Sequence, residues 1–438
     1  MSVETEKLNV KFIERMKKQL PEPEWGEFFS VYTKKPYKGV RVNPLKCTAQ
    51  DFEKISPFKL EPITWEKNGF YVEEEKIGAS PYHFSGVLYS QEPSAMVAGP
   101  MLAVKSGEKV LDLCSAPGGK GTQLAGEMQG KGLIVLNEPV QSRAKILSQN
   151  VERMGIKNAV VTSEMPDKLA DKFAGFFDKI LVDAPCSGEG MFRKNADEAL
   201  REWSEENVEL CAKRQKEILA CARAMLKKGG RLVYSTCTFA YEEDEGQVLD
   251  FLSAFPDMKL ITQEKLYPHR VRGEGHFAAL FERTDGEELV NYRQAKQEVT
   301  KSTEKAYREF EKDFFKVPFA CSLYESKGGV YALPDGAFDW KGLNVLRVGV
   351  RLGEMLNGRF EPSHSLAMAS SAKDCKRVVS LDVNDARLDK FLCGETIDFE
   401  LPNGWCLVCV DKYPIGLGKA VNGTIKNHIP KGLRKMSK

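Results

Sequence analysis

The chain has 438 residues, a length that predicts two or three domains rather than one. Hydrophobic residues make up 42% and charged residues 29%, a balance that excludes a disordered chain and is typical of a globular protein with a sizeable core. The net charge of +2 excludes a uniformly basic surface, so any contact with nucleic acid has to rest on local clusters of positive charge.

Cysteine usage and the start of the chain indicate the compartment. The eleven cysteines are an odd number without a repeating spacing, so we expect a reducing compartment rather than a disulfide framework. The first twenty residues are charged throughout and lack the apolar stretch of a secretory signal. Because no uncharged apolar stretch approaches the roughly 20 residues of a membrane span, we expect no membrane contact and a cytoplasmic location.

Residues 1–90 are expected to form an N-terminal segment. Leu8, Phe12 and Met16 recur at helical spacing, which predicts an amphipathic first helix that ends before Pro21. A stretch of mixed character follows it.

Residues 91–285 alternate between short apolar strands and helical stretches. Strands are predicted over 110–113, 133–137, 159–162, 179–183 and 231–235, and helices over 141–154 and 208–227. This alternation predicts an α/β fold, namely a doubly wound and mostly parallel sheet with helices on both faces. A late strand is predicted over 275–283, with an antiparallel place at the sheet edge as one option.

The composition changes after this α/β region. Residues 286–313 are rich in Glu, Lys, Arg and Gln, which predicts a solvated and partly helical linker. Short β-like runs separated by Gly and Pro then predict a mostly β region in two pieces, 314–370 and 371–438.

A glycine-containing turn follows the first predicted strand, and a helix is expected to begin near Thr122. The carboxyl edge of a parallel sheet is where ligands bind, adjacent glycines let the backbone approach a ligand closely, and amides at a helix start favour an anionic group. The turn comprises Cys114, Ser115, Ala116, Pro117, Gly118, Gly119 and Lys120.

Glu138 ends the second predicted strand, where a carboxylate can accept hydrogen bonds from both ribose hydroxyls of an adenosine. The turn lacks the GxGxxG and GxxxxGK[ST] patterns, which disfavours a nicotinamide cofactor and ATP hydrolysis. A tight turn that serves only packing remains an alternative.

Two cysteines follow two strands that are expected to be neighbours. Asp183 and Cys186 stand where the fourth predicted strand ends, and Cys237 follows the fifth. A lone cysteine is usually an inert core residue, but two of them at adjacent strand tips beside an aspartate favour chemistry. A thiol has a use in methylation of cytosine, whose carbon 5 is a poor nucleophile until a thiolate adds to carbon 6. Such a reaction requires the base to be turned out of any helical stack. The spacing leaves open which cysteine attacks and which assists release.

These motifs resemble the Sun family of RNA 5-methylcytosine methyltransferases, in particular its bacterial RsmF-like branch that acts on 16S ribosomal RNA. The matching stretches are CSAPGGK at 114–120, DAPCSGEGMFRK at 183–194, YSTCTFAYEEDE at 234–245 and PHRVRGEGHF at 268–277. The resemblance implies a class I, Rossmann-like methyltransferase fold, S-adenosyl-L-methionine as cofactor, and a PUA-like RNA-binding domain over 371–438.

The resemblance also implies roles for single residues. Cys237 is expected to be the nucleophile and Cys186 to help expel the product, with Lys120 in the active site near Asp183. The expected cofactor contacts are residues 114–120, Glu138 and Asp183. The family also has an acidic cofactor contact just after the third strand, for which Glu164 is a candidate one position away from the usual place.

An acidic run from Glu242 to Glu245 follows Cys237, and Asp244 stands where relatives often carry Asn. We interpret the run as the first turn of a helix, where the helix dipole favours negative charge.

Three basic regions are candidates for RNA contacts, since Arg and Lys hold phosphates. Arg41, Asn43 and Lys46 resemble the family's N-terminal RNA-binding segment, and Arg193 and Lys194 follow the first cysteine motif. The last twenty residues contain no Asp or Glu, and the candidates there are Lys426, Lys431 and Arg434. A solvated basic tail is the alternative for this last region.

The expected partner is ribosomal RNA, free or in the small ribosomal subunit, and the expected oligomeric state is a monomer. Cys406 and Cys409 have CxxC spacing but no second ligand pair nearby, and the histidines are scattered, so we expect no metal. A cytosine-5 methyltransferase of transfer RNA, or a catalytically silent ribosome-assembly factor that binds RNA, remain the alternative functions.

Overall fold

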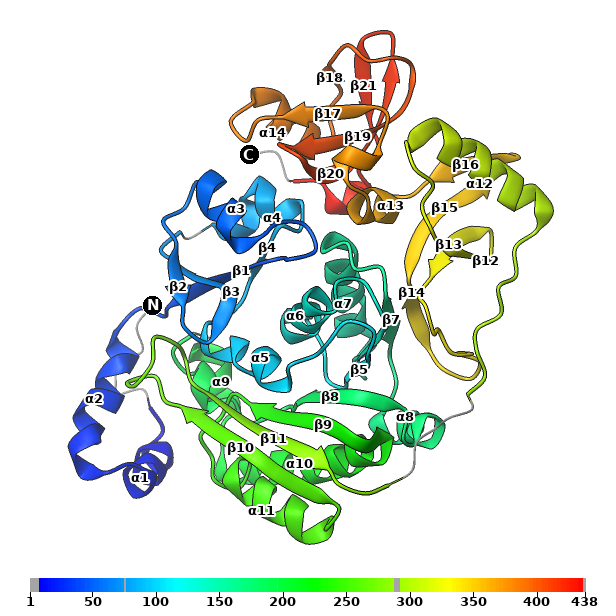
Figure 1. Ribbon diagram of the computed structural model, residues 1–438. Coiled ribbons are helices and arrows are strands. Elements are labelled where there is room, and N and C mark those ends of the chain that lie inside the picture. Colours follow the sequence, from blue (N-terminus) through cyan, green and yellow to red (C-terminus); the bar gives the residue numbers. More distant parts are fainter. Residues whose placement is uncertain (1–7, 75, 195, 287–291, 436–438) are drawn as a thin grey trace.

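The computed structural model describes residues 8–74, 76–194, 196–286 and 292–435 (Figure 1). Residues 1–7 of the expected N-terminal segment, 287–291 of the expected linker and 436–438 of the expected C-terminal domain lie outside the described residues. In the part that is described, no helix combines the length and the apolar character that crossing a membrane requires.

A mixed sheet forms the centre of the molecule and has the order β10-β11-β9-β8-β5-β6-β7-β14 over the described residues. Its five inner strands pair in parallel, which confirms the predicted α/β fold and the five predicted strands. These strands are β5 (Lys109–Asp112), β6 (Leu133–Asn137), β7 (Ala159–Thr162), β8 (Phe177–Asp183) and β9 (Leu226–Thr236).

Helices cover both faces of this sheet, because its strands are apolar on both sides (Figure 1). One face packs against α5 (Ala98–Leu102), α6 (Gly119–Glu127) and α7 (Gln141–Arg153). The other face packs against α8 (Pro166–Phe173), α10 (Glu205–Met225) and α11 (Glu245–Ala254), and α9 (Ala196–Glu202) precedes α10. The two predicted helices correspond to α7 and α10.

Two antiparallel strands extend the sheet beyond β9. The predicted late strand is β11 (His276–Arg283), which pairs antiparallel with β9. Its predicted place at the edge is wrong, because β10 (Met258–Leu266) pairs outside it. Most residues of β10 are at least partly exposed, so its sequence lacks the apolar run by which the inner strands were recognised.

The opposite edge is completed from the far end of the chain. β14 (Val345–Val348), within the expected 314–370 region, pairs antiparallel with β7. The Arg347 guanidinium forms an ion pair with Glu152 of α7. The remaining strands of this region form a separate sheet of β12 (Ser322–Ser326), β13 (Gly329–Leu333), β15 (Val350–Leu356) and β16 (Arg359–Pro362).

The expected solvated linker contains a packed helix, α12 (Lys301–Phe314). Tyr307, Phe310 and Phe314 are buried along one side of it and contact the sheet that follows. The prediction of a solvated segment is therefore wrong for this part, because three aromatic residues at helical spacing outweigh the surrounding charge.

The N-terminal segment confirms the predicted first helix, α1 (Val10–Gln19), in which Phe12 and Met16 are buried and Asn9 caps the start. The helix α2 (Trp25–Ser30) follows. A sheet of order β2-β3-β1-β4 with two short helices follows in the sequence. These elements are β1 (Lys38–Val42), α3 (Ala49–Ile55), β2 (Glu61–Ile63), β3 (Glu66–Val72), α4 (Pro81–Phe84) and β4 (Leu88–Ser90).

The C-terminal domain packs on the N-terminal segment and shares its hydrophobic core (Figure 1). The Tyr82 hydroxyl donates to Asp411 over 2.7 Å, and Cys47 Sγ lies 2.9 Å from the Tyr413 hydroxyl. The domain consists of β17 (Val378–Leu381), α14 (Ala386–Leu392), β18 (Ile397–Asp398), β19 (Gly404–Val410), β20 (Tyr413–Val421) and β21 (Thr424–Asn427). The helix α13 (His364–Ala369) of the 314–370 region precedes it.

A buried ion pair fastens two loops that border the sheet. Arg193 Nη2 lies 2.6 Å from Glu274 Oε1, and the two side chains are 2% and 1% exposed. Arg193 also donates to the Gly273 carbonyl over 3.0 Å. Burial raises the pKa of Glu274 even though Arg193 opposes the shift.

The substitution Arg193→Met is expected to lower the free energy of unfolding by about 3–5 kcal/mol, because it leaves the Glu274 carboxylate buried without its partner. Urea denaturation measures the effect. The control is Lys216→Met, which removes the exposed Lys216–Asp250 pair and should cost less than about 1 kcal/mol. Equal losses in the two variants would contradict a structural role of the buried pair.

Candidate active site

A cavity of about 580 Å³ lies at the carboxyl ends of the parallel strands. This volume is within the range of pockets that hold small ligands, roughly 300–1,000 Å³. Of the predicted site residues, the cavity wall contains Cys114, Ala116, Glu138, Asp183, Cys186 and Cys237. In the described residues, no three His, Cys, Asp or Glu side chains are grouped so that they could hold a metal ion.

The turn before α6 has the backbone geometry for which its glycines are needed. Gly118 has φ +111°, which an L side chain rarely adopts, and α6 begins directly after it. A Cβ at Gly121 would lie 2.5 Å from Ser115 Oγ, so the helix can approach β5 closely only with glycine there. Ser115 Oγ donates to Asp112 over 2.8 Å. Burial raises the pKa of Asp112 to about 7.

The Glu138 carboxylate lies at the end of β6 and its side chain is 3% exposed. One oxygen accepts the Val140 amide over 3.0 Å, and the other lies 3.2 Å from Arg143 Nη1. Glu138 and Arg143 both line the cavity, so this hydrogen-bonded carboxylate forms part of its wall.

Asp183, in the cavity wall, forms an ion pair with Lys120 of α6, with Oδ2 2.8 Å from Nζ. The Ser235 hydroxyl, one strand away, donates to the other oxygen over 2.9 Å. Although burial alone would raise the pKa of Asp183, the Lys120 ammonium holds it below its ordinary value. The predicted proximity of Lys120 to Asp183 is present in the structure.

His276 also faces Asp183, at 3.9 Å from Nε2 to Oδ1. Burial, with a contribution from the nearby Lys120 ammonium, lowers the pKa of His276 to about 3, which keeps the ring neutral. Neither ring nitrogen has a hydrogen-bond partner in the structure. Sequence reasoning missed this residue, since its proximity arises only from the antiparallel pairing of β11 with β9.

The two cysteine sulfurs lie 3.1 Å apart, and both are partly exposed to the cavity. The Cys237 amide donates to Cys186 Sγ over 3.4 Å. The contact with Cys237, together with burial, raises the pKa of Cys186 well above its ordinary value. This geometry suits a hydrogen bond between the two sulfurs, and the raised pKa keeps Cys186 a neutral thiol.

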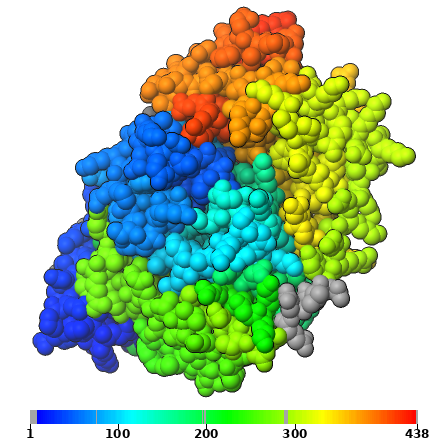
Figure 2. All heavy atoms as spheres, viewed as in Figure 1, coloured from blue at the N-terminus to red at the C-terminus, as the bar shows by residue number. Residues whose placement is uncertain are grey.

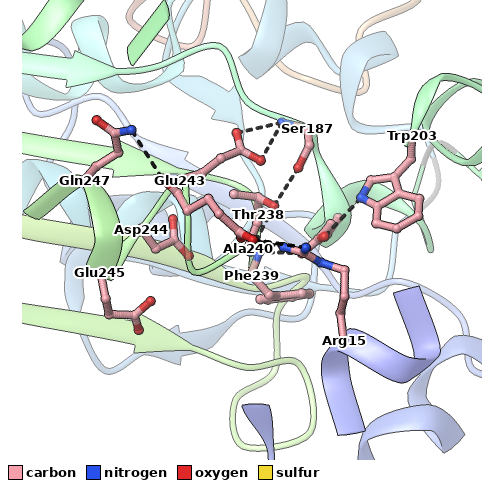
Figure 3. A network of polar contacts seen from close by, with 12 residues as sticks. Arg15, Ser187, Trp203, Thr238, Phe239, Ala240, Glu243, Asp244, Glu245 and Gln247 are labelled. Carbon is pink, nitrogen blue, oxygen red and sulfur yellow. Dashed lines mark hydrogen bonds and ion pairs between the residues drawn. The ribbon is translucent and has the colours of Figure 1, made fainter. Parts of the chain in front are cut away.

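Two buried carboxylates, Glu189 and Glu243, hold the cysteine loops, and Figure 3 shows the contact of Glu243 with Ser187. Glu243 accepts the Ser187 amide over 3.0 Å and the Gln215 side-chain amide over 2.8 Å. Glu189 accepts the Trp203 indole and the Phe239 amide, each over 3.0 Å. Each carboxylate therefore joins a residue of one loop to another segment of the chain.

The interpretation of residues 242–245 as the first turn of a helix is wrong for most of the run. Helix α11 begins at Glu245, and Glu243 and Asp244 are fully buried before it. Asp244 accepts the Thr236 hydroxyl over 2.6 Å and lies 2.9 Å from Lys265 Nζ. Burial raises the pKa of Asp244 to about 8.

Glu164 differs from its predicted role as a cofactor contact. Its carboxylate accepts the Asn344 amide and lies 2.9 Å from Lys168 Nζ, and the residue is absent from the cavity wall. It therefore helps to attach the segment before β14. Asp167, at the start of α8, does line the cavity. The Met165-Pro166-Asp167 sequence, with proline in the first turn, was the signal for this helix start.

The N-terminal RNA candidates lie inside the protein, which corrects their predicted phosphate contacts. Arg41 is 1% exposed and donates to the Gly119 carbonyl over 2.9 Å and to Thr122 over 2.8 Å. Asn43 is buried as well, and its amide donates to the Met154 carbonyl over 2.9 Å. Their donors are used to attach this part of the N-terminal segment to α6 and to the end of α7.

The predicted phosphate contacts of Lys46 and Arg193 are also corrected, because both side chains bind acceptors within the protein. Lys46 Nζ donates to the Arg153 carbonyl over 3.2 Å, and burial lowers its pKa to about 7. Arg193 is held by Glu274. By contrast, Lys194, Lys426 and Lys431 are exposed, whereas Arg434 is half-buried and donates to the Ile429 carbonyl over 3.0 Å. RNA contacts by these last four residues remain predictions.

Four family models match successive parts of the chain. The N-terminal domain of 16S rRNA methyltransferase RsmF matches residues 8–93, and 16S rRNA methyltransferase RsmB/F matches residues 100–282. The RsmF rRNA methyltransferase first C-terminal domain matches residues 309–369, and the methyltransferase RsmF PUA domain matches residues 378–435.

Two ribosomal RNA methyltransferases resemble the chain over nearly its full length, and a solved structure resembles 63% of it. Ribosomal RNA small subunit methyltransferase F of Vibrio vulnificus strain YJ016 is 32% identical over 457 residues, covering 96% of both chains. The protein of the same name from Shewanella piezotolerans is 31% identical, covering 98% of this chain and 97% of its own. The solved structure of a methyltransferase homologue from Pyrococcus horikoshii is 28% identical with a TM-score of 0.56, covering 63% of this chain and 96% of its own.

Glu243 is expected to make the free energy of unfolding depend on pH, because burial raises its pKa from 4.5 to about 7. Below pH 4.5 the carboxyl is protonated in both the folded and the unfolded chain, and it adds no pH-dependent cost. Between pH 4.5 and 7 the unfolded chain releases the proton more readily, so the free energy of unfolding falls by about 3 kcal/mol. Above pH 7 the loss is constant.

Glu243→Gln removes this titration, so its free energy of unfolding should gain about 3 kcal/mol on the wild type between pH 4.5 and 7. Urea denaturation at a series of pH values measures the difference. Glu217→Gln, at an exposed glutamate of the cavity wall, is the control and should stay parallel to the wild type. A Glu243→Gln curve that also stays parallel to the wild type would contradict the predicted loss of stability.

Proposed function

Because this chain belongs to the RsmF family of 16S ribosomal RNA methyltransferases, we propose that it methylates carbon 5 of a cytosine in that RNA. The observation that carries the cytosine chemistry is the pair of sulfurs, Cys186 and Cys237, 3.1 Å apart in the wall of a ligand-sized cavity. In this proposal the enzyme acts as a monomer in the cytoplasm, on free RNA or on the small subunit.

The cavity fits S-adenosyl-L-methionine as the methyl donor. Glu138 would accept hydrogen bonds from the ribose hydroxyls, and the 114–120 turn would border the amino-acid part with its backbone. Asp167 is an additional polar group on the same wall and replaces Glu164 as the acidic candidate after β7. When bound, the cofactor supplies an electrophilic methyl group.

The attack on cytosine would start from Cys237. Its thiolate adds to carbon 6 of the ring, which moves electron density to carbon 5 and lets that atom take the methyl group. Asp183, kept ionised by Lys120, would accept a hydrogen bond from the exocyclic amine of the base and orient the ring. The base has to leave any helical stack to reach this cavity.

Release would depend on Cys186. After a base removes the proton from carbon 5, elimination restores the ring double bond and expels the Cys237 sulfur. The raised pKa of Cys186 favours a neutral thiol beside that sulfur. Its proton can then stabilise the departing thiolate over the short distance between the two sulfurs.

Cys237→Ala is expected to reduce methylation by roughly a thousandfold or more, since a covalent step cannot proceed without its nucleophile. Transfer of labelled methyl groups to 16S ribosomal RNA measures the rate, and bisulfite sequencing identifies the modified position as a cytosine carbon 5. Cys186→Ala is expected to accumulate a covalent protein–RNA adduct that is visible on a denaturing gel.

Cys221→Ala is the matched control, because Cys221 lines the same cavity from α10 but is not one of the paired cysteines. It should retain activity within roughly twofold of the wild type. Wild-type rates in Cys237→Ala would refute the covalent mechanism. An adduct in Cys237→Ala and none in Cys186→Ala would reverse the two roles.

Glu138→Ala is expected to weaken the binding of S-adenosyl-L-methionine by about 10- to 100-fold, because hydrogen bonds to a charged group contribute about 1.5–3 kcal/mol. Isothermal titration calorimetry measures the affinity. Glu164→Ala is the control, since that carboxylate is bound to Asn344 and Lys168. Equal affinities in Glu138→Ala and the wild type would remove Glu138 from the cofactor site.

A further inference from the structure

A second cavity, of about 730 Å³, lies between the N-terminal segment and the methyltransferase domain and is termed the basic groove here. Its walls come from residues 35–38, the β2–β3 hairpin region, and the single residues Lys194 and Arg272. Figure 2 shows the green part of the methyltransferase domain packed directly against the blue N-terminal segment. The groove therefore depends on parts of the chain that are distant in sequence.

Positive charge is concentrated in this groove. Five of its lining side chains are basic and two are acidic, an excess of three charges, whereas the whole chain has a net charge of +2. Within the described part of the chain, Lys35, Lys38, Lys59 and Lys194 form no ion pair with an acidic side chain. These ammonium groups are thus available to a polyanion.

Aromatic rings stand among these charges. The Tyr37 and Tyr71 ring centroids lie 6.3 Å apart. The Arg272 guanidinium is 4.1 Å from the Tyr71 centroid and 5.4 Å from the Tyr37 centroid. Tyr37 is 38% exposed and lines the groove. An exposed ring beside guanidinium and ammonium groups is the combination on which unpaired bases stack.

Two short segments connect the basic groove to the paired cysteines. The Gly190 amide donates to the Cys237 carbonyl over 2.8 Å, and Lys194 follows four residues later. Arg272 precedes His276, the neighbour of Asp183, by four residues, which span at most about 14 Å. The buried Arg193–Glu274 pair holds the two segments side by side.

We propose that the basic groove binds a single-stranded segment of the substrate RNA that adjoins the target base, an inference that rests on the proposed function. The lysines hold phosphates, and Tyr37 provides a stacking surface for one base. Single strands are favoured over duplex RNA because a base must be unpaired to stack on a side chain, and proteins recognise A-form duplexes through their backbone.

The test uses the full-length protein and a fluorescein-labelled single-stranded ribo-oligonucleotide of roughly twelve nucleotides, with the same strand in a duplex for comparison. Tyr37→Ala is expected to weaken binding of the single strand by roughly tenfold, while Tyr37→Phe stays within about twofold because it keeps the ring. Binding of the duplex should not change with Tyr37→Ala. Fluorescence anisotropy measures the affinities.

The charge contribution is tested by the triple variant Lys35→Gln, Lys38→Gln and Lys194→Gln. If these lysines contact phosphates of a single strand, the slope of log affinity against log salt should fall by about 2, since each contact contributes about 0.7. The control is Lys259→Gln, at an exposed lysine of the edge strand β10, which should leave the slope unchanged.

Wild-type affinity in Tyr37→Ala, or a wild-type salt slope in the triple variant, would overturn the proposal. So would equal losses for single strand and duplex, which would indicate a general electrostatic surface. The outcome is separable from that of the proposed function, because oligonucleotide binding requires no methyl transfer. A failure of the function would appear as methylation by Cys237→Ala with anisotropy results unaffected.

Discussion

The parallel pairing of β8 with β9 is the constraint on which the candidate site depends. Asp183 is in register with Ser235, so the residues that follow the two strands emerge side by side at the same edge of the sheet. The pairing also explains why Ser235 can donate to Asp183 and why two sulfurs that are 51 positions apart in sequence come within 3.1 Å. A one-residue slip would turn one side chain of each pair to the opposite face.

The loops after these strands are held by buried carboxylates rather than by apolar packing alone. Glu243 and Glu189 accept backbone amides from the two cysteine loops, at Ser187 and Phe239. Burying such groups opposes their ionisation, which is visible in the raised pKa of both carboxyls. The fold thus gives up stability to fix the positions of the cysteines, a compromise found at sites where precise geometry matters more than stability.

Sequence reasoning predicted the inner sheet and several residues that meet in one cavity at its edge, because both are encoded locally. Buried parallel strands are continuous apolar runs, and the residues that follow them reach the same edge in any doubly wound sheet. It failed where long-range pairing decides the structure. β14 joins the sheet from more than 180 positions after β7, and Glu164 is taken up by that junction. His276 gains its place near Asp183 only through the antiparallel return of β11.

The basic residues show a further regularity that composition alone conceals. Arg41 and Arg193 are buried and bind several acceptors at once, as a planar guanidinium with five donors can. Lys194 stays exposed beside Arg193, since a compact and strongly hydrated ammonium is costly to bury. Lys46, which is partly buried, shows this cost, because burial lowers its pKa to about 7. Arg41 and Arg193 thus hold segments of the protein together, while Lys194 contributes to the external positive charge.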